Sequence, residues 1–554
     1  MISPYCWCPS SGLTLEPNAE KAVISKDGCI ALLAGPGAGK TETLAQRADF
    51  LLRTGASPYP KRILAISFKK DASENLKDRV AKRCGPELSA RFDSYTFHAF
   101  GKRLIDIFRT ALTGQDALNE DYTVGDHRIF LSQITFNDMV SLANEILNKC
   151  AVARNSIQAA YSDVFLDEFQ DCNNTQYSLV LNAFKNCGVR IIAVGDTKQK
   201  IMGYAGALEG IFIKFQKDFE ATSLNLYQNF RSLHRIRRVH NRMVRDIDPG
   251  AAVPDGQISK DEGEVVYESF DDDVGEAKWV ADSIELWKTQ GLPLSQIAFL
   301  CNTQPHLYAQ KFMGMLTQRG IPFRNEQEIQ ELSAEPLFCL VTDFLLILMG
   351  DTEPDAWERL RKVLDSDIVE GSLSPRGWDK FIRAAKRSLN KNPTFQNAWN
   401  LIEELLEKLG MNKIRGLSYD YEMDIRRGEI LGDIKVHISS IFDEKSDTLK
   451  SLKTVGGVDA VRILTIHKCK GLEFHTVIVQ GVEPQTFFGK KEDAECAFFV
   501  AISRARKRLI TTTSAFREKL PGANQYWSQR RNEYEQFLSY VKPEVGGRIC
   551  EPTE

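Results

Sequence analysis

Short runs of apolar and β-branched residues recur along this chain of 554 residues, each followed by a longer stretch with helical spacing. A first set covers 29–34, 62–68, 164–166 and 190–194, and a second covers 296–300, 461–466, 476–479 and 508–513. Strands alternating with helices are typical of α/β proteins whose parallel sheets are covered by helices on both faces. Ligands of such sheets bind at the carboxyl ends of the strands. The alternation therefore predicts two parallel-sheet domains and places candidate functional residues directly after the runs.

Two stretches with helical patterning interrupt these sets, and we interpret both as helical insertions. The predicted organisation is a first sheet domain over 1–110 and 162–232 with an insertion at 111–161, and a second sheet domain over 233–326 and 456–554 with an insertion at 327–455.

Composition narrows the class of protein. Hydrophobic residues make up 43% and charged residues 26%, as in soluble globular proteins. No apolar run approaches the roughly 18 residues of a membrane span, and the start lacks a signal-peptide pattern, so we expect a cytoplasmic protein without a membrane partner. The twelve cysteines contain no Cys-x-x-Cys pair, which argues against a zinc or iron–sulfur site. The net charge of −3 does not indicate nucleic-acid binding, but 231–245 and 376–391 are locally basic, and we favour the first as a functional surface.

A glycine-rich segment follows the first run. It comprises Ala34, Gly35, Pro36, Gly37, Ala38, Gly39, Lys40 and Thr41. This pattern is a phosphate loop with alanine at its first glycine position; its backbone N–H groups surround phosphate oxygens at a helix start. We expect Lys40 to neutralise the β- and γ-phosphates of ATP, and the Thr41 hydroxyl to bind Mg²⁺.

Two carboxylates follow the run at 164–166. Asp167 suits Mg²⁺, which prefers oxygen ligands, and Glu168 can polarise the attacking water. Gln199, after the run at 190–194, is a candidate sensor of the γ-phosphate. Arg231 and Arg504 are candidates for stabilising the charge that develops on it.

Together these segments resemble superfamily 1A helicases of the UvrD/Rep/PcrA type. The motifs that carry the resemblance include Asp167-Glu168-Phe169-Gln170-Asp171, Thr96-Phe97-His98-Ala99-Phe100, Gly195-Asp196 with Gln199, and Val500-Ala501-Ile502-Ser503-Arg504-Ala505. The resemblance covers about 13–509 and is weak in the second insertion. It implies two RecA-like domains of the P-loop NTPase class that bind ATP and Mg²⁺, with single-stranded DNA across them and 3′-to-5′ translocation.

Carried over position by position, the resemblance implies further contacts. Gln170 and Glu473 are expected to contact the nucleotide, the latter at its sugar. The implied DNA-facing residues are Phe68, Thr96, His98, Tyr204 and His467. Aromatic faces at such positions stack on any base without reading sequence.

The sequence also departs from the family pattern. Ala19 occupies the position of the adenine-reading glutamine, for which Asn18 is a candidate substitute. The segment Tyr204-Ala205-Gly206-Ala207 lacks the arginine that couples the ATP and DNA sites. The first insertion is also shorter than in the housekeeping helicases.

Three functions are compatible with this sequence. The first is a DNA-dependent ATPase that translocates on, or unwinds, single-stranded DNA or a duplex with a single-stranded tail in repair or recombination. The second is a DNA-sensing ATPase subunit that regulates a partner nuclease in a hetero-oligomer, since the compact insertions resemble the UvrD-like subunit of the bacterial Gabija anti-phage system. The third is a nucleotide-binding scaffold without turnover, which the complete hydrolytic residue set disfavours.

Overall fold

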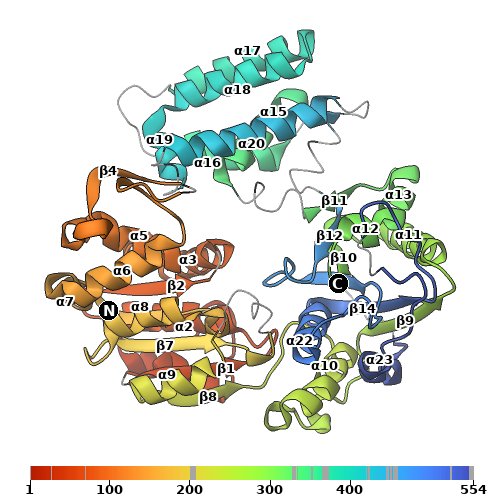
Figure 1. Ribbon diagram of the computed structural model, residues 1–554, viewed down its shortest axis with the longest axis horizontal. Helices are drawn as coiled ribbons and strands as arrows, with labels where there is room; N and C mark the ends of the chain where they lie inside the picture. Colours follow the sequence, from red (N-terminus) through yellow and green to blue (C-terminus); the bar gives the residue numbers. More distant parts are fainter. Residues whose placement is uncertain are drawn as a thin grey trace. The chain divides into compact units, whose positions relative to one another are not determined.

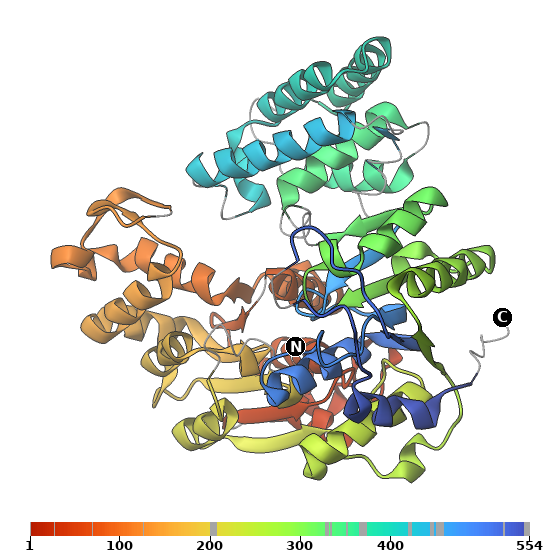
Figure 2. The ribbon, with the colours of Figure 1, turned by 45° about the vertical axis from the view of Figure 1, so that its right-hand side comes forward.

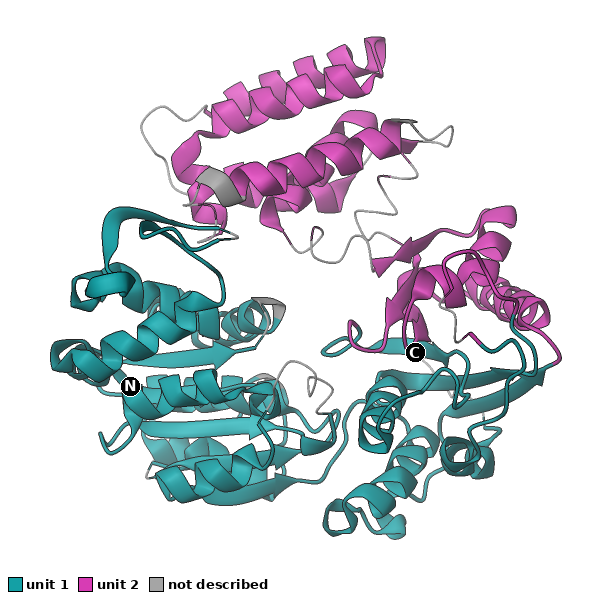
Figure 3. Ribbon diagram, in the orientation of Figure 1, with its two compact units in different colours: residues 1–270, 469–517, 528–554 teal, residues 271–468, 518–527 magenta. Residues whose placement is uncertain are grey.

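The computed structural model of the protein describes residues 2–26, 28–68, 70–125, 127–199, 208–326, 332, 335–350, 353–364, 374–418, 421, 424–443, 448–449, 452, 459–523 and 527–547. Its contacts divide the chain into two units (Figure 3). The first comprises 1–270, 469–517 and 528–554, and the second 271–468 and 518–527. These units do not follow the predicted domain boundaries, because 233–270 and 469–517 belong to the first unit.

A six-stranded parallel sheet forms the centre of the first unit, in the order β3-β2-β6-β7-β1-β8 (Figure 1). Its strands are β1 (Ile30–Ala34), β2 (Arg62–Ser67), β3 (Phe92–Thr96), β6 (Tyr161–Leu166), β7 (Arg190–Gly195) and β8 (Thr222–Leu226). The four predicted strands are the inner ones. The two that we did not predict, β3 and β8, are the edge strands, where polar residues remain at the surface and obscure the apolar pattern.

Helices cover both faces of this sheet, so neighbouring residues of one strand enter opposite cores. In β2, Leu64 and Ile66 pack in one core, whereas Ile63 and Ala65 pack in the other. The first core contains α5 (Phe97–Phe108), α6 (Asp138–Lys149), α7 (Ala151–Ala160), α8 (Asn174–Phe184) and α9 (Ile211–Phe219). The second contains α1 (Pro17–Ile24), α2 (Lys40–Arg53) and α3 (Lys70–Cys84), which α4 (Pro86–Ser89) follows. Each fully buried aliphatic side chain contributes about 1.5–3 kcal/mol, which holds the strand ends in fixed positions.

The first insertion contains strands as well as helices, so the expectation of a purely helical insertion was incomplete. Strands β4 (Leu118–Val124) and β5 (Leu131–Ile134) pair ahead of α6. Helices α5 and α6 approach closely at Gly101, where a Cβ atom would lie 3.0 Å from the Met139 carbonyl oxygen. This contact fixes the start of α6 against α5.

Further parallel strands occur in each unit. The first unit contains β9 (Glu264–Phe270), β13 (Phe474–Val479) and β14 (Ala505–Ser514), in the order β13-β14-β9, together with α10 (His234–Ile247), α22 (Lys491–Ile502) and α23 (Glu535–Val541). The second contains β10 (Ile297–Cys301), β11 (Phe323–Asn325) and β12 (Val461–Thr465), in the order β11-β12-β10, with α11 (Asp273–Thr289), α12 (Pro305–Tyr308) and α13 (Gln310–Gln318).

The second insertion is helical where it is described, as expected. Its helices α15 (Pro336–Met349), α16 (Pro354–Leu364), α17 (Pro375–Lys391), α18 (Phe395–Leu409), α19 (Met411–Leu417) and α20 (Asp424–Asp443) share one apolar core. They form the cyan and green bundle at the top of Figure 2. Helix α15 is apolar on nearly all sides, which suits its position in the core that it shares with the other helices of the insertion. Within the described part of the chain, no helix has the length and apolarity needed to cross a membrane.

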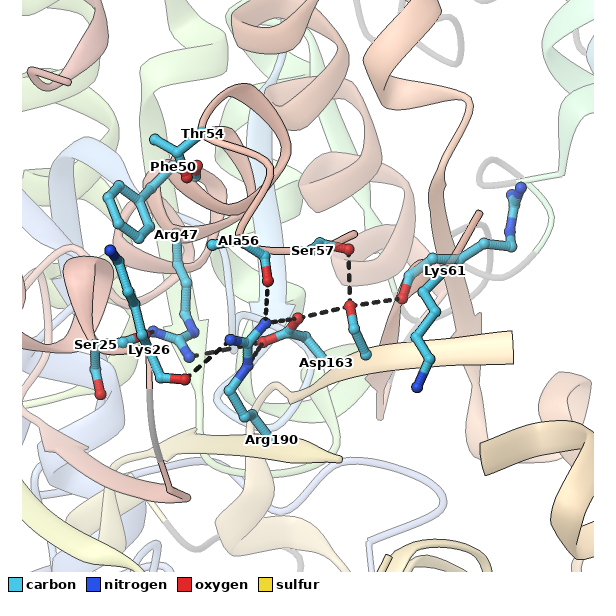
Figure 4. A network of polar contacts seen from close by, with 12 residues as sticks. Ser25, Lys26, Arg47, Phe50, Thr54, Ala56, Ser57, Lys61, Asp163 and Arg190 are labelled. Atoms are coloured by element: carbon cyan, nitrogen blue, oxygen red, sulfur yellow. Dashed lines mark hydrogen bonds and ion pairs between the residues drawn. The ribbon is translucent and has the colours of Figure 1, made fainter. Parts of the chain in front are cut away.

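A buried polar network joins the amino ends of β6 and β7, opposite the edge that carries the motifs (Figure 4). Asp163 accepts two hydrogen bonds from Arg190, at 2.8 and 2.6 Å, and lies 3.7 Å from a guanidinium nitrogen of Arg47. Arg47 also donates to the carbonyl groups of Ala22 and Ser25. The network thereby fastens α1 and α2 to the centre of the sheet.

Candidate nucleotide and nucleic-acid site

The phosphate loop connects β1 to α2. Gly37 and Gly39 have φ values of +69° and +78°, a left-handed conformation that L side chains rarely adopt. The turn leaves the first N–H groups of α2 without helical acceptors, as a phosphate site requires. Lys40, the first residue of α2, lies with its amino group 3.5 Å from the Ala34 carbonyl oxygen, across the loop. Thr41 follows it in the first turn, half-buried.

A distant segment packs directly on this loop. The Phe230 N–H donates to the Gly37 carbonyl at 2.9 Å, and a Cβ atom on Gly37 would lie 2.5 Å from Asn229 Oδ1. Asn229 Oδ1 accepts from the N–H groups of Arg231 and Ser232, which forms a tight turn. Only glycine at position 37 leaves room for this turn, so the loop and Arg231 are held side by side.

The two predicted carboxylates emerge at the end of β6. Asp167 is buried, and its N–H donates to the Ile66 carbonyl of the neighbouring β2 at 3.1 Å. Glu168 has a φ of +51°, a left-handed conformation uncommon for glutamate. Backbone strain of this kind is concentrated at functional sites, where surrounding contacts enforce it.

The surroundings shift the pKa values of Asp167 and Glu168 in opposite directions. Burial, and then the charge of Glu168, raise the pKa of Asp167 to about 7. Burial also acts to raise the pKa of Glu168, but the charges of Lys40 and Lys470 and the hydrogen bond from Gln170 outweigh it and hold that pKa at about 2. Glu168 is therefore ionised at neutral pH, as a base that orients water must be.

Asp167 also fits a divalent cation. It is 4% exposed, and the charges of Lys40 and Lys470 only partly offset the burial that raises its pKa. A buried carboxylate at the end of β6 and the Thr41 hydroxyl in the first turn of α2 match the oxygen donors that Mg²⁺ prefers.

Gln170, predicted to contact the nucleotide, orients Glu168 in this structure. Its amide nitrogen donates to Glu168 Oε2 at 2.5 Å, and its amide oxygen accepts from the Asp196 N–H at 3.1 Å. This arrangement depends on Gly195, because a Cβ atom there would lie 2.1 Å from Gln170 Oε1. The amide thus ties the Glu168 carboxylate to the end of β7.

The structure brings together the side chains of Gln199 and Arg504, the predicted γ-phosphate sensor and one of the predicted charge-stabilising arginines. Arg504 Nη2 donates to Gln199 Oε1 at 2.8 Å, and both side chains are buried. Burial, followed by the nearby Arg231, lowers the pKa of Arg504 to about 10, so the guanidinium stays charged at neutral pH. The amide nitrogen of Gln199 is buried and has no hydrogen-bond partner among the described residues.

Lys470 belongs to this site although we did not predict it. Its amino group donates to Asp171 Oδ2 at 2.6 Å and to the Gln199 carbonyl at 2.9 Å, and it lies 3.9 Å from Glu168 Oε2. A lysine beside Gly471 within a motif that already supplied His467 and Glu473 was the available signal. Its burial was not visible in the sequence.

Arg231 and Glu473 form an ion pair at 2.7 Å. The Glu473 carboxylate, expected at the nucleotide sugar, therefore neutralises a predicted catalytic arginine. Phe230, next to Arg231, is 62% exposed beside the phosphate loop, where its ring is available to stack on a base. An aromatic residue between the polar residues Asn229 and Arg231 was the available signal for Phe230, which we did not predict.

Side chains of the amino-terminal segment hold β8 and the residues that follow it. The Asn18 amide donates to the Asn225 carbonyl at 2.8 Å, and Ala19 is buried in the core. Glu16 accepts from the N–H groups of Tyr227 and Gln228. Asn18 is therefore engaged by the backbone, and its role as a substitute base reader remains a prediction.

Three predicted DNA-facing residues gather at the same sheet edge as the carboxylates. Ser67 of β2 is paired in register with Thr96 of β3, which places Phe68, Thr96 and His98 at neighbouring strand ends. The Thr96 hydroxyl caps α5 by accepting from the Ala99 N–H, and all three side chains are half-buried. Tyr204 lies outside the described residues. His467 is half-buried after β12 in the second unit.

The favoured basic segment, 231–245, is largely neutralised. In α10, Arg235 and Arg238 pair with Asp261, Arg238 and Arg242 with Glu544, and Arg245 with Asp255. These guanidinium groups hold the first unit together, and we no longer favour this helix as a free basic surface.

The chain is similar to known proteins over most of its length. Residues 19–205 match the family described as AAA domain, and residues 393–515 match the UvrD-like helicase C-terminal domain. Among curated proteins, an ATP-dependent DNA helicase PcrA from Bacillus subtilis (strain 168) is 25% identical over 91% of this chain and 83% of its own length. Proteins of the same name from Leuconostoc citreum and Staphylococcus epidermidis are 22% and 23% identical, and each alignment covers 84% of the relative.

Proposed function

Because the chain belongs to the UvrD/PcrA-like superfamily 1A helicases, we propose that it couples ATP hydrolysis to movement along single-stranded DNA. One observation carries the coupling. The Asp167 N–H donates to the Ile66 carbonyl at 3.1 Å, so the strand that ends at the hydrolytic carboxylates is bonded to the strand that leads into Phe68. In this proposal, a change at the phosphates reaches the predicted DNA-facing edge through the paired strands β6 and β2, whose pairing runs from Arg62 opposite Tyr161 to Ile66 opposite Leu166.

In the proposed hydrolysis, the residues of the first unit position and stabilise charge. The loop N–H groups and Lys40 hold the triphosphate. The Glu168 carboxylate, which is ionised and is itself oriented by Gln170, orients the attacking water. Gln199, Arg231 and Arg504 stabilise the γ-phosphate as its bond to the β-phosphate breaks. Thr41 and Asp167 would hold Mg²⁺, which neutralises phosphate charge when bound.

The test is steady-state ATPase activity with and without single-stranded DNA. We expect strong stimulation in the wild type and none in Lys40→Ala, with Lys82→Ala, an exposed lysine of α3, as the matched control. Glu168→Gln is expected to bind ATP and hydrolyse it at least about 100-fold more slowly, because the base is lost. Its control is Glu87→Gln at an exposed position. Normal turnover in Lys40→Ala would refute the assignment of this site.

We propose 3′-to-5′ polarity, which the family resemblance implies. The measurement is displacement of streptavidin from oligonucleotides biotinylated at one end. Displacement from the 5′ end only is the expected result, and displacement from the 3′ end only would reverse the assignment.

The same ATPase measurement addresses the alternative of a DNA-sensing subunit that regulates a partner nuclease in an anti-phage complex. That function predicts a folded, ATP-binding protein whose turnover rises only when its partner is added. Full stimulation by DNA alone would argue for the autonomous motor.

A further inference from the structure

A cavity of about 330 Å³ lies within the first unit, beside the beginning of the phosphate loop. Gly35 of the loop, Thr197 after β7 and Tyr227 after β8 line it, together with one side of α10. Its lining, as far as the structure describes the chain, includes none of the predicted hydrolytic residues, which are Lys40, Asp167, Glu168, Gln199, Arg231 and Arg504. The cavity is therefore separate from the phosphate site, and its volume falls within the range of small-molecule sites, roughly 300–1,000 Å³.

Helix α10 presents different arginines on two of its sides. One side carries the arginines that pair with Asp255, Asp261 and Glu544. The other lines the cavity with residues spaced three, four and seven positions apart, which are Arg237, His240, Asn241 and Val244. The Arg237 guanidinium is half-buried, and burial alone lowers its pKa, since no described residue forms a hydrogen bond or an ion pair with it. A cation without a counter-charge in contact thus stands at the cavity wall.

His240 is a second group in the wall with unused hydrogen-bonding capacity. The side chain is 5% exposed, and neither ring nitrogen has a hydrogen-bond partner in the described part of the chain. Burial lowers the pKa of His240 to about 4, and the nearby Ile502 backbone offsets only part of this effect. The ring is therefore neutral at pH 7, with one donor nitrogen and one acceptor nitrogen. Buried polar groups normally have partners, so this ring calls for one from a ligand.

Asp196 contributes a buried acceptor to the same cavity. Its side chain accepts the Lys198 N–H at 3.1 Å through Oδ1, whereas Oδ2 has no hydrogen-bond partner among the described residues. The Lys198 amino group lies 3.5 Å from Asp196 and 3.4 Å from Asp248, so carboxylates already compensate its charge. Asp196 therefore favours a ligand with a hydrogen-bond donor, and its own charge repels a strongly anionic ligand such as free phosphate.

The rest of the wall is largely apolar and is held in place. Asn241 fastens the segment after α10, because its amide donates to the Val253 carbonyl at 2.7 Å and accepts the Val253 N–H at 2.8 Å. The apolar side chains of the lining are Leu33, Ala34, Val244, Val253, Ile258 and Phe499. Such a wall favours a ligand with an apolar body over a small hydrated ion.

We propose that this cavity binds a small aromatic monoanion that also carries a hydrogen-bond donor. Its negative group pairs with Arg237, its donor reaches Asp196 Oδ2, and its ring packs against the apolar wall beside His240. The inference goes beyond the proposed function and does not depend on it. A ligand held here contacts both the start of the phosphate loop and the segment that leads to Gln199.

The experiment measures binding of three probes to the full chain by ligand-observed NMR titration. The first, 4-hydroxybenzoate, has the ring, the single charge and the donor; benzoate lacks the donor, and inorganic phosphate lacks the ring. We expect 4-hydroxybenzoate to bind, and benzoate to bind about tenfold more weakly because the hydrogen bond to a charged acceptor is lost. Phosphate and a non-hydrolysable ATP analogue are expected to leave the bound probe in place.

Variants of α10 assign the binding to this cavity. Arg237→Met keeps the length of the side chain and removes its charge, so 4-hydroxybenzoate should bind at least about tenfold more weakly. Arg245→Met, on the paired side of the same helix, is the matched control and should bind as the wild type does. His240→Phe keeps a ring beside Phe499 but has no ring nitrogen, and should also weaken binding. Melting temperatures and ATP binding of each variant confirm that it is folded.

Wild-type affinity for 4-hydroxybenzoate in folded Arg237→Met and His240→Phe would overturn the inference. Absence of binding to the wild type at millimolar concentrations would equally overturn it and leave a cavity that holds water. Displacement by phosphate would indicate a general anion site, and displacement by the ATP analogue would place the probe in the nucleotide site. Both results would contradict the proposal, whereas none of the four bears on whether DNA stimulates ATP hydrolysis.

Discussion

Arg504 donates a hydrogen bond of 2.8 Å to the side chain of Gln199, from which it is separated by 305 positions in the chain. Val500 and Leu472 supply carbonyl acceptors to the same guanidinium group. The arginine is thus oriented from several sides before any phosphate binds. A group held in this way loses little entropy when charge develops on the γ-phosphate.

This pairing predicts non-additive kinetics. We expect Gln199→Ala and Arg504→Ala each to lower the DNA-stimulated kcat by at least about 100-fold, and the double variant to be little worse than the more damaged single variant. Steady-state ATPase assays of the wild type, the two single variants and the double variant test this prediction, and Arg361→Ala, at an exposed position of α16, is the control. Additive losses would show that the two side chains act independently.

Lys470 is expected to contribute both to ATP hydrolysis and to the stability of the fold. Lys470→Met removes the buried cation beside Asp171 and Glu168, and we expect the free energy of unfolding to fall by about 3–5 kcal/mol together with the ATPase rate. Adding Asp171→Asn should restore much of the stability, because a neutral pair needs no counter-charge, while the rate stays low. Urea denaturation and ATPase assays of both variants, with exposed Lys490→Met as control, test this prediction.

Gly195→Ala should disturb catalysis through Gln170. The new Cβ atom would lie 2.1 Å from Gln170 Oε1 and displace the amide that orients Glu168. We expect a lower kcat with ATP affinity retained, and a loss of stability of about 1–3 kcal/mol. Gly314→Ala, where no atom lies within 4 Å, is the matched control. Removing the closest clash with Gln170→Ala should recover part of the stability, since Phe212 Cζ would still lie 2.9 Å from the new Cβ atom. The rate should stay low, and its recovery would contradict the assigned role.

Asp163→Asn tests the network at the other end of the sheet. The change leaves Arg47 and Arg190 without their shared carboxylate, so we expect a loss of about 3–5 kcal/mol in unfolding free energy. Activity per folded molecule should be unchanged, because the phosphate site lies at the opposite strand ends. Chemical denaturation and ATPase assays check the two halves of the prediction. Glu358→Gln, at a fully exposed pair, should have no measurable effect.

His98 predicts a pH dependence of defined sign. Burial lowers its pKa from 6.5 to about 4 in the folded protein, so between these values the unfolded state binds more protons. The contribution of His98 to stability is complete above pH 6.5 and declines as the pH falls towards 4, by about 1–3 kcal/mol. Denaturation across pH 4–8 should show a shallower slope for His98→Gln than for the wild type or for His306→Gln, at an exposed position. Identical slopes would show that His98 is accessible to protons.

The inner strands of the first sheet and the motifs after them were predictable, because a strand covered on both faces is a continuous apolar run and its ligands bind at one end. The edge strands β3 and β8 were not predictable on this basis, since their surface-facing residues are polar. Strand β4 of the first insertion is also mostly polar and exposed, so the sequence pattern does not distinguish it from helical surroundings.

The sequence by itself determined the composition of the site: a phosphate loop with Lys40, the carboxylates Asp167 and Glu168, and arginines far along the chain. These are local patterns, and the chemistry of ATP hydrolysis limits which residues can form them. The tertiary structure decided how they are paired. In the tertiary structure Gln170 hydrogen-bonds to Glu168, and Lys470 pairs with Asp171. Carboxylates neutralise arginines of α10, and the Phe136 ring stacks on His98. Except for Gln170 and Glu168, which are near neighbours in the chain, these pairings join residues distant in the chain. Only packing of the whole unit brings their charges and rings within contact distance.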